Sequence, residues 1–100
     1  MTDDDIWNLK VELVKLGNQG KHQEQIDFML KNKNNLDYQF CSMFVMSFEI
    51  GSVDVPDELL KIIVPFIIKG GSVIEMFRIS VIVGDRDIDN FIESEGEKNK

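Results

Sequence analysis

Along most of the chain, apolar residues recur every three or four positions, which is the spacing of one face of an α-helix. The first predicted helix begins after Thr2, which forms a capping box with Asp5, and ends at Gly17. Its inner face carries Ile6, Leu9, Leu13 and Leu16. After a polar connection at 18–21, the apolar residues of 26–30 predict a shorter helix that stops in the asparagine-rich run 32–35. These two helices form a predicted hairpin.

The segment 36–50 is apolar almost throughout, but its polar residues fall on one narrow helical stripe. They are Gln39, Ser42 and Glu49. This pattern predicts a central helix that is buried on most sides and ended by Gly51.

The next segment, ELLKIIVPFIIKGG at 58–71, has seven residues from Ile62 to Ile68 without a charge. A membrane span needs about 20 such residues, and a central strand does not tolerate the proline within the stretch. The exceptions to the apolar run form one outward line: Glu58, Lys61, Pro65 and Lys69. We therefore expect a helix that starts after Pro56 and stops at the paired glycines 70–71.

Ser72 and Glu75 form a second capping box, which predicts a fifth helix from Val73 to Val83, ended by Gly84. The alternating residues 77–83 also suit a strand, so both interpretations stay open. A last helix is expected to begin at Asp85 and to turn Ile88, Phe91 and Ile92 inward. The prediction is one all-α domain over 1–92, followed by a frayed acidic tail over 93–100.

The helix-ending glycines Gly17, Gly51 and Gly84 lie 34 and 33 residues apart, which is a repeat length. A shift of 33 residues places Met43 and Phe44 on Met76 and Phe77. Each unit of helix, glycine turn and helix needs a neighbour to cover its apolar face. The sequence thus predicts three stacked helical hairpins.

The pattern FVMSFEIGSVDVPDELLKIIVPFIIKGG, a helix, a short acidic connection and a second apolar helix closed by glycines, resembles ankyrin-like repeats. The resemblance covers residues 36–92 and is shared with HEAT-like helical repeats. It departs from ankyrin repeats at 35–38, where Asn-Leu-Asp-Tyr stands in place of Thr-Pro-Leu-His. Both resemblances imply a scaffold that binds other proteins.

The net charge of −7 restricts the possible partners, because a strongly acidic chain repels nucleic acid and attracts basic proteins. The single cysteine, Cys41, cannot form a disulfide within the chain, and residues 1–20 lack the pattern of a signal peptide. We expect a cytoplasmic protein without a membrane anchor. The densest acidic cluster consists of Asp85, Asp87, Asp89, Glu93, Glu95 and Glu97, opposed only by Arg86. The surface around the first five of these residues is predicted to dock a basic protein.

The spacing of the three aspartates is similar to a calcium loop, but Asn90 replaces the turn glycine and Gly96 replaces the bidentate glutamate. We therefore predict no metal and no cofactor. His22 lies in a polar connection and Cys41 in the most apolar helix, and no catalytic motif is present, so we predict that the chain is not an enzyme.

Trp7 and Tyr38 each combine an apolar ring with a polar tip and are predicted to contact a partner. The methionines and phenylalanines at helical spacing are assigned to the core instead: Met43, Phe44, Met46, Phe48, Met76 and Phe77. The hypothesis that follows is an acidic protein-binding module, namely a bacterial immunity- or antitoxin-type inhibitor that occludes the basic active site of a nuclease-like toxin. The alternative is an adaptor or regulatory subunit that completes a larger assembly through apolar helix faces.

Overall fold

A computed structural model describes residues 2–92, and all regular secondary structure in that range is helical. The elements are α1 (Asp3–Asn18), α2 (His22–Lys31), the short 3₁₀ helix η1 (Lys33–Asn35), α3 (Tyr38–Ser47), α4 (Asp57–Gly70) and α5 (Val73–Val83). A further helical turn occupies 89–92. The predicted all-α class is confirmed, and the strand interpretation of 77–83 is wrong. The predicted tail over 93–100, with Glu93 and Glu95, lies outside the described residues.

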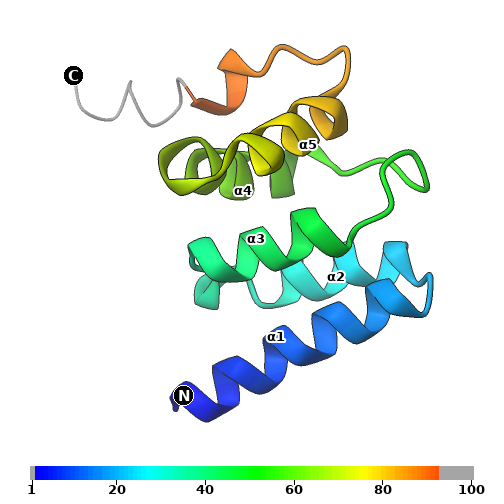
Figure 1. The fold of residues 1–100 in the computed structure, drawn as a ribbon, viewed down its shortest axis with the longest axis vertical. Coiled ribbons are helices and arrows are strands. Elements are labelled where there is room, and N and C mark those ends of the chain that lie inside the picture. Colours follow the sequence, from blue (N-terminus) through cyan, green and yellow to red (C-terminus); the bar gives the residue numbers. More distant parts are fainter. Residues whose placement is uncertain (1, 93–100) are drawn as a thin grey trace.

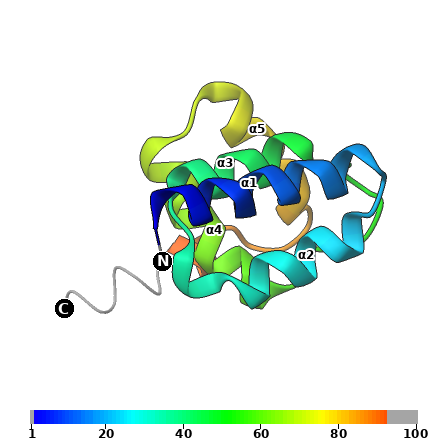
Figure 2. The same cartoon turned by 90° about the horizontal axis from the view of Figure 1, so that it is seen from below.

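The helices are arranged around α3, which packs against α1, α4 and α5. Figure 1 shows α1 and α2 at one end of the molecule, α4 and α5 toward the other end, and α3 between them. Seen from below in Figure 2, α1, α3 and α5 lie on one side, and α2 and α4 lie on the other. Helices that follow one another along the chain thus alternate between two sides. We call the outer side of α1, α3 and α5 the odd-helix face.

The helix starts follow the predicted caps. Thr2 and Asp5 exchange hydrogen bonds of 3.1 and 3.2 Å at the start of α1, and Ser72 and Glu75 do the same at the start of α5 with 3.0 and 3.2 Å. Asp37 caps α3 by accepting a hydrogen bond from the Phe40 backbone N–H at 2.8 Å, a role that the sequence reading missed. These side chains satisfy backbone N–H groups that have no partner within the helix.

Two of the three glycines predicted to end helices do something else. Gly17 is inside α1, which ends at Asn18, and a Cβ atom there would lie 2.7 Å from the Ser47 carbonyl oxygen of α3. Gly51 lies in the loop after α3, with φ +92, because α3 already ends at Ser47. Only Gly84 caps its helix as predicted, with φ +64. The glycine period therefore marks three different backbone roles.

Fully buried side chains from all five α-helices form one core. Its members include Leu13, Ile26, Met29, Phe40, Phe44, Leu60, Ile63, Ile67 and Ile79. The inward direction predicted for Phe91 is confirmed, because this ring is buried. Pro65 lies within α4 and is half-buried, while Glu58, Lys61 and Lys69 are exposed as predicted.

The prediction that His22 is an exposed loop residue is wrong. His22 is buried and is the first residue of α2. Its Nδ1 lies 2.8 Å from Gln25 Oε1, and Gln25 in turn donates to the Leu13 carbonyl oxygen and the Ser47 hydroxyl. This chain of hydrogen bonds joins α1, α2 and α3. Cys41 is a core thiol, as predicted, and burial raises its pKa to about 12, which makes it unreactive.

Candidate functional site

The exposed half of α5 is apolar and carries no charge. Val73, Ile74 and Phe77 are 84%, 61% and 69% exposed, and Val81 continues the same stripe one turn further. Among the other exposed residues of α5, Met76 is apolar and Ser80 is neutral. We call Val73, Ile74, Phe77 and Val81 the α5 apolar face. A helix on the surface of a globular protein normally presents charged side chains at such positions.

The two charged residues of α5 point inward instead, against α3. Glu75 is buried and accepts hydrogen bonds from the Tyr38 hydroxyl at 2.7 and 2.9 Å. Arg78 donates to the backbone carbonyl oxygens of Val45 at 2.8 Å and Phe48 at 2.7 Å, where α3 ends. Since both charges serve the contact with α3, α5 leaves only uncharged residues for solvent.

The electrostatics of Glu75 fit this structural role. Burial opposes ionisation of its carboxyl group, but hydrogen bonds from Ser42, Ser72 and Tyr38 outweigh burial and lower its pKa to about 2. The same contact raises the pKa of Tyr38, since its hydroxyl donates to an anion. The carboxylate is therefore ionised and satisfied near neutral pH, which does not suit a catalytic acid or base.

Exposed apolar side chains are also present on α3 and α1. Met46 on α3 and Trp7 on α1 are each 50% exposed, and Val11 lies one turn from Trp7. Of the nine large apolar residues that are exposed among the described residues, eight belong to these three helices, and the exception is Ile68 on α4. Most of the exposed apolar surface among the described residues thus belongs to the three helices of the odd-helix face.

The core assignment of the methionines and phenylalanines is correct for Phe44 and Phe48, which are buried. It is wrong for Met46, Met76 and Phe77, which are exposed. Helical spacing did not separate the two groups, because α3 and α5 are apolar on more than one side.

The structure separates the two predicted aromatic contact residues. Trp7 is exposed and borders a shallow hollow of about 350 Å³ between α1 and α3, together with Val11, Val14 and Met43. Tyr38 is half-buried, its ring lies over Gly70, and its hydroxyl is committed to Glu75. Tyr38 therefore links α3 to α5 within the fold, whereas Trp7 presents its ring on the odd-helix face.

Asp85, Asp87 and Asp89 are exposed in the segment that follows α5. The last helix was predicted to begin at Asp85, but the helical turn begins at 89. Asp87 Oδ1 accepts a hydrogen bond from the Asp89 backbone N–H at 3.0 Å. The three carboxylates thus lie in the segment that follows the C-terminal end of α5. Glu93 and Glu95 lie outside the described residues.

Arg86, expected to oppose the acidic cluster, has other partners. Its guanidinium donates to the carbonyl oxygens of Val55 at 2.6 Å, Val83 at 3.0 Å and Ile82 at 3.0 Å, and to Asp57 Oδ1 at 3.1 Å. This side chain joins the end of α5 to the start of α4. It caps carbonyl groups at the C-terminus of α5, which is where a cation is favourable.

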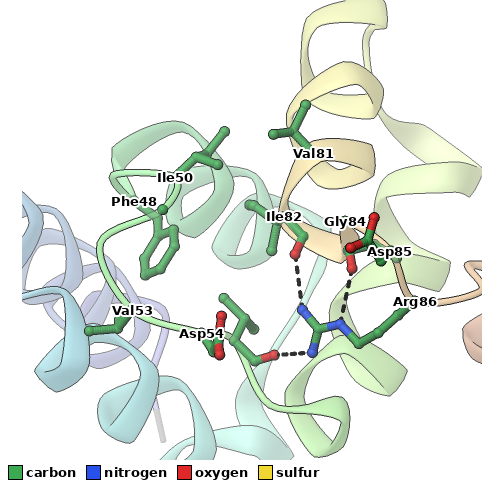
Figure 3. A pocket seen from close by; sticks show the side chains of 12 residues that line it. Phe48, Ile50, Val53, Asp54, Val81, Ile82, Gly84, Asp85 and Arg86 are labelled. Atoms are coloured by element: carbon green, nitrogen blue, oxygen red, sulfur yellow. Dashed lines mark hydrogen bonds between the residues drawn. The ribbon is translucent and has the colours of Figure 1, made fainter.

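Beside Arg86 lies a groove of about 630 Å³, between the loop that follows α3 and the end of α5. Figure 3 shows Asp54 on the loop side and Asp85 on the α5 side, with Arg86 between the two walls. The remaining lining is mostly apolar: Phe48, Ile50, Val53, Val55, Val81, Ile82 and Val83. Val81 belongs both to this groove and to the α5 apolar face, so the two surfaces are continuous.

Within residues 2–92, no three His, Cys, Asp or Glu side chains are close enough together to hold a metal ion. The described helices are each too short or too polar to cross a bilayer. Comparison of the chain with family models, with curated proteins and with solved structures finds no match. The candidate site is therefore defined by its geometry: the α5 apolar face, with a mostly apolar groove at one end that contains Asp54, Asp85 and Arg86.

Proposed function

We propose that the chain is a small protein-binding module that docks its partner on the odd-helix face. The observation that carries this proposal is the reversed polarity of α5, whose two charges face α3 while its exposed half is apolar. Contiguous apolar surface on a soluble domain is typical of interaction sites. Its function is binding and occlusion rather than catalysis.

The exposed side chains suit the centre of an interface. Trp7 and Phe77 are large aromatic residues, and covering one such side chain contributes about 1.5–3 kcal/mol. Aromatic residues are enriched among the few side chains that dominate binding energy. A partner that covers Phe77 and Val81 also approaches the groove with Asp54 and Asp85.

The charge of the chain supports a basic partner. The net charge is −7, Asp85 lines the groove, and Asp87 and Asp89 are exposed in the segment that follows it along the chain. Such a field accelerates association with a cationic protein and disfavours nucleic acid. An immunity- or antitoxin-type inhibitor of a basic, nuclease-like toxin in the bacterial cytoplasm combines these properties, with carboxylates facing the cations that hold phosphate groups in the toxin.

The scaffold that we propose is a stack of three helical hairpins. The packing of α1 with α2, α3 with α4, and α3 with both α1 and α5 supports two complete hairpins and the first helix of a third. In helical-repeat proteins of this kind, one set of helices forms a continuous binding surface. The odd-helix face would be that surface here.

A second function, an adaptor or regulatory subunit, is favoured by one specific observation. The α5 apolar face contains no charge, as expected for a contact that completes a larger assembly by apolar burial. The dependence of the association rate on ionic strength distinguishes the two functions. Association with a basic toxin becomes slower as ionic strength rises, whereas an apolar subunit contact responds little.

The experiment is affinity capture from the source cells with the wild-type chain and with a Phe77→Ser, Val81→Ser variant. We expect one basic protein to be retained by the wild type, to be lost with the variant, and to be inhibited in its own activity by the wild-type chain. Association rates are then measured over a salt series. Equal retention of the partner by both baits would contradict docking on the odd-helix face.

A further inference from the structure

The groove beside Val81 has one exposed carboxylate on each wall. Building on the proposed function, we propose that an arginine or lysine of the basic partner enters this groove between Asp54 and Asp85, next to an apolar partner residue that covers Phe77 and Val81. The chemistry of the groove walls, the commitment of Arg86 and the continuity with the α5 apolar face carry this inference.

The carboxylates of Asp54 and Asp85 favour a positively charged ligand group in the groove. Asp54 and Asp85 are exposed, one on each wall of the groove, and neither forms an ion pair or a side-chain hydrogen bond with another residue of 2–92. Figure 3 shows both walls with Arg86 between them. A guanidinium or ammonium group that enters the groove beside Arg86 can therefore pair with the carboxylate of Asp54 or of Asp85.

Arg86 does not reverse this preference. An arginine has five N–H donors, and Arg86 directs its guanidinium at three backbone carbonyl oxygens and at Asp57. Its charge is balanced by Asp57, which lies 3.1 Å away. An anionic ligand would meet Asp54 and Asp85 without an uncommitted cation to pair with.

The shape of the groove suits a long cationic side chain. The volume of about 630 Å³ is open to solvent on one side and bordered by Ile50, Val53 and Val55 from the loop and by Val81 from α5. Lysine and arginine lay their methylene stems along apolar surface and keep the charged end among polar groups. Because Val81 belongs to both surfaces, one partner segment can place adjacent side chains on the groove and on the α5 apolar face.

The test uses two defined probes, acetyl-Phe-Arg-amide and acetyl-Phe-citrulline-amide, which differ in charge but hardly in shape. Backbone amide signals of the folded chain are followed by NMR up to about 10 mM probe, since so small a ligand is expected to bind in the millimolar range. We expect shifts around 50–55 and 81–86, with a Kd for the arginine probe about threefold or more below that for citrulline, as for an exposed ion pair.

The variant Asp54→Asn, Asp85→Asn is expected to bind both probes equally. The matched control, Glu24→Gln, Asp27→Asn, removes the same charge from exposed positions of α2 and is expected to keep the preference for arginine. Equal binding of the two probes to the wild type, shifts confined to other parts of the chain, or no shift at all would overturn the inference.

The outcome is separable from that of the proposed function. If arginine shows no preference but Phe77→Ser, Val81→Ser abolishes partner capture, the groove inference falls and the odd-helix face remains the docking surface. If arginine is preferred but the Phe77→Ser, Val81→Ser variant captures the partner as well as the wild type does, the groove is a cation subsite and the proposal of docking on the odd-helix face is wrong.

Discussion

Gly17 sets the distance between α1 and α3. Gly17 has a helical backbone, so a glycine is not needed there for an unusual φ angle. Its lack of a side chain allows the Ser47 carbonyl oxygen and the Gln25 amide to come close to the α1 backbone. We expect Gly17→Ala to lower the free energy of unfolding by about 1–3 kcal/mol through overpacking. Alanine's better helix propensity, worth about 1 kcal/mol, offsets only part of this loss. Urea denaturation measures the change.

Gly70→Ala is the matched control for this substitution. A Cβ atom at Gly70 would lie 3.4 Å from the Tyr38 ring, which is an ordinary contact, and the residue ends α4. The stability of the Gly70→Ala protein should equal or exceed that of the wild type. A Gly17→Ala protein as stable as the Gly70→Ala protein would show that α1 and α3 are not in close contact at this point.

Phe44 and Phe77 differ in burial although both were assigned to the core. Phe44→Ala removes a fully buried ring and should lower the free energy of unfolding by about 3–5 kcal/mol. Phe77→Ala trims an exposed ring and should change it by about 0.5 kcal/mol or less. Thermal and urea unfolding of both variants provide the measurement. Similar losses for the two substitutions would place Phe77 in the core and remove the α5 apolar face.

Sequence reasoning was reliable for residues whose role is local. The caps formed by Thr2 with Asp5 and by Ser72 with Glu75 depend on residues three positions apart, and both are present as predicted. The roles of Gly17 and His22 depend on Ser47 and Gln25, which folding brings close to them. No local pattern distinguishes a glycine that ends a helix from one that admits a neighbouring backbone.

At the scale of the elements, α3 and α5 are held together by Tyr38 and Glu75. The folded-state pKa of Glu75 is about 2, below its ordinary value of 4.5. A depressed pKa adds stability that is fully present above pH 4.5 and is lost as the pH falls toward 2. We expect Glu75→Gln to be less stable than the wild type near pH 7, with the difference shrinking over this acidic range. Urea unfolding at several pH values tests the prediction.

Glu24→Gln is the control, because Glu24 is an exposed carboxylate of α2 without these hydrogen bonds. Its stability should follow the wild type from neutral pH to pH 2. A constant difference between the wild type and Glu75→Gln at all pH values would mean that the carboxylate charge does not stabilise the contact between α3 and α5.

Most helices were predictable as elements, and the difference lay in which side each one buries. The bounds of α4 and α5 match the predicted helices, because paired glycines and caps delimit them. The outward side of α5 was not predictable, since the segment is apolar on several sides. One local pattern points to it. Glu75, Arg78, Ile79 and Ile82 follow the spacing i, i+3, i+4, i+7, which is one face of a helix. The two charged residues therefore lie on the same side of α5 as the buried isoleucines.

At the scale of the whole molecule, most of the large exposed apolar residues belong to α1, α3 and α5, and three exposed aspartates follow the end of α5. Charge at the rim of an interface mainly changes the rate of association. We expect Asp87→Lys, Asp89→Lys to fold normally and to associate with the captured basic partner about tenfold more slowly at low salt. Stopped-flow or surface-based kinetics measure this rate. An unchanged rate would exclude these two carboxylates from the docking surface.

Docking on the odd-helix face is tested by photo-crosslinking in the source cells, with a benzophenone amino acid placed at position 77 in one variant and at position 68 in another. Both positions are exposed and apolar, but Phe77 lies on the odd-helix face and Ile68 on α4. We expect a cross-linked product with a basic protein from position 77 and none from position 68. A product from position 68 alone, or equal products from both, would contradict docking on the odd-helix face.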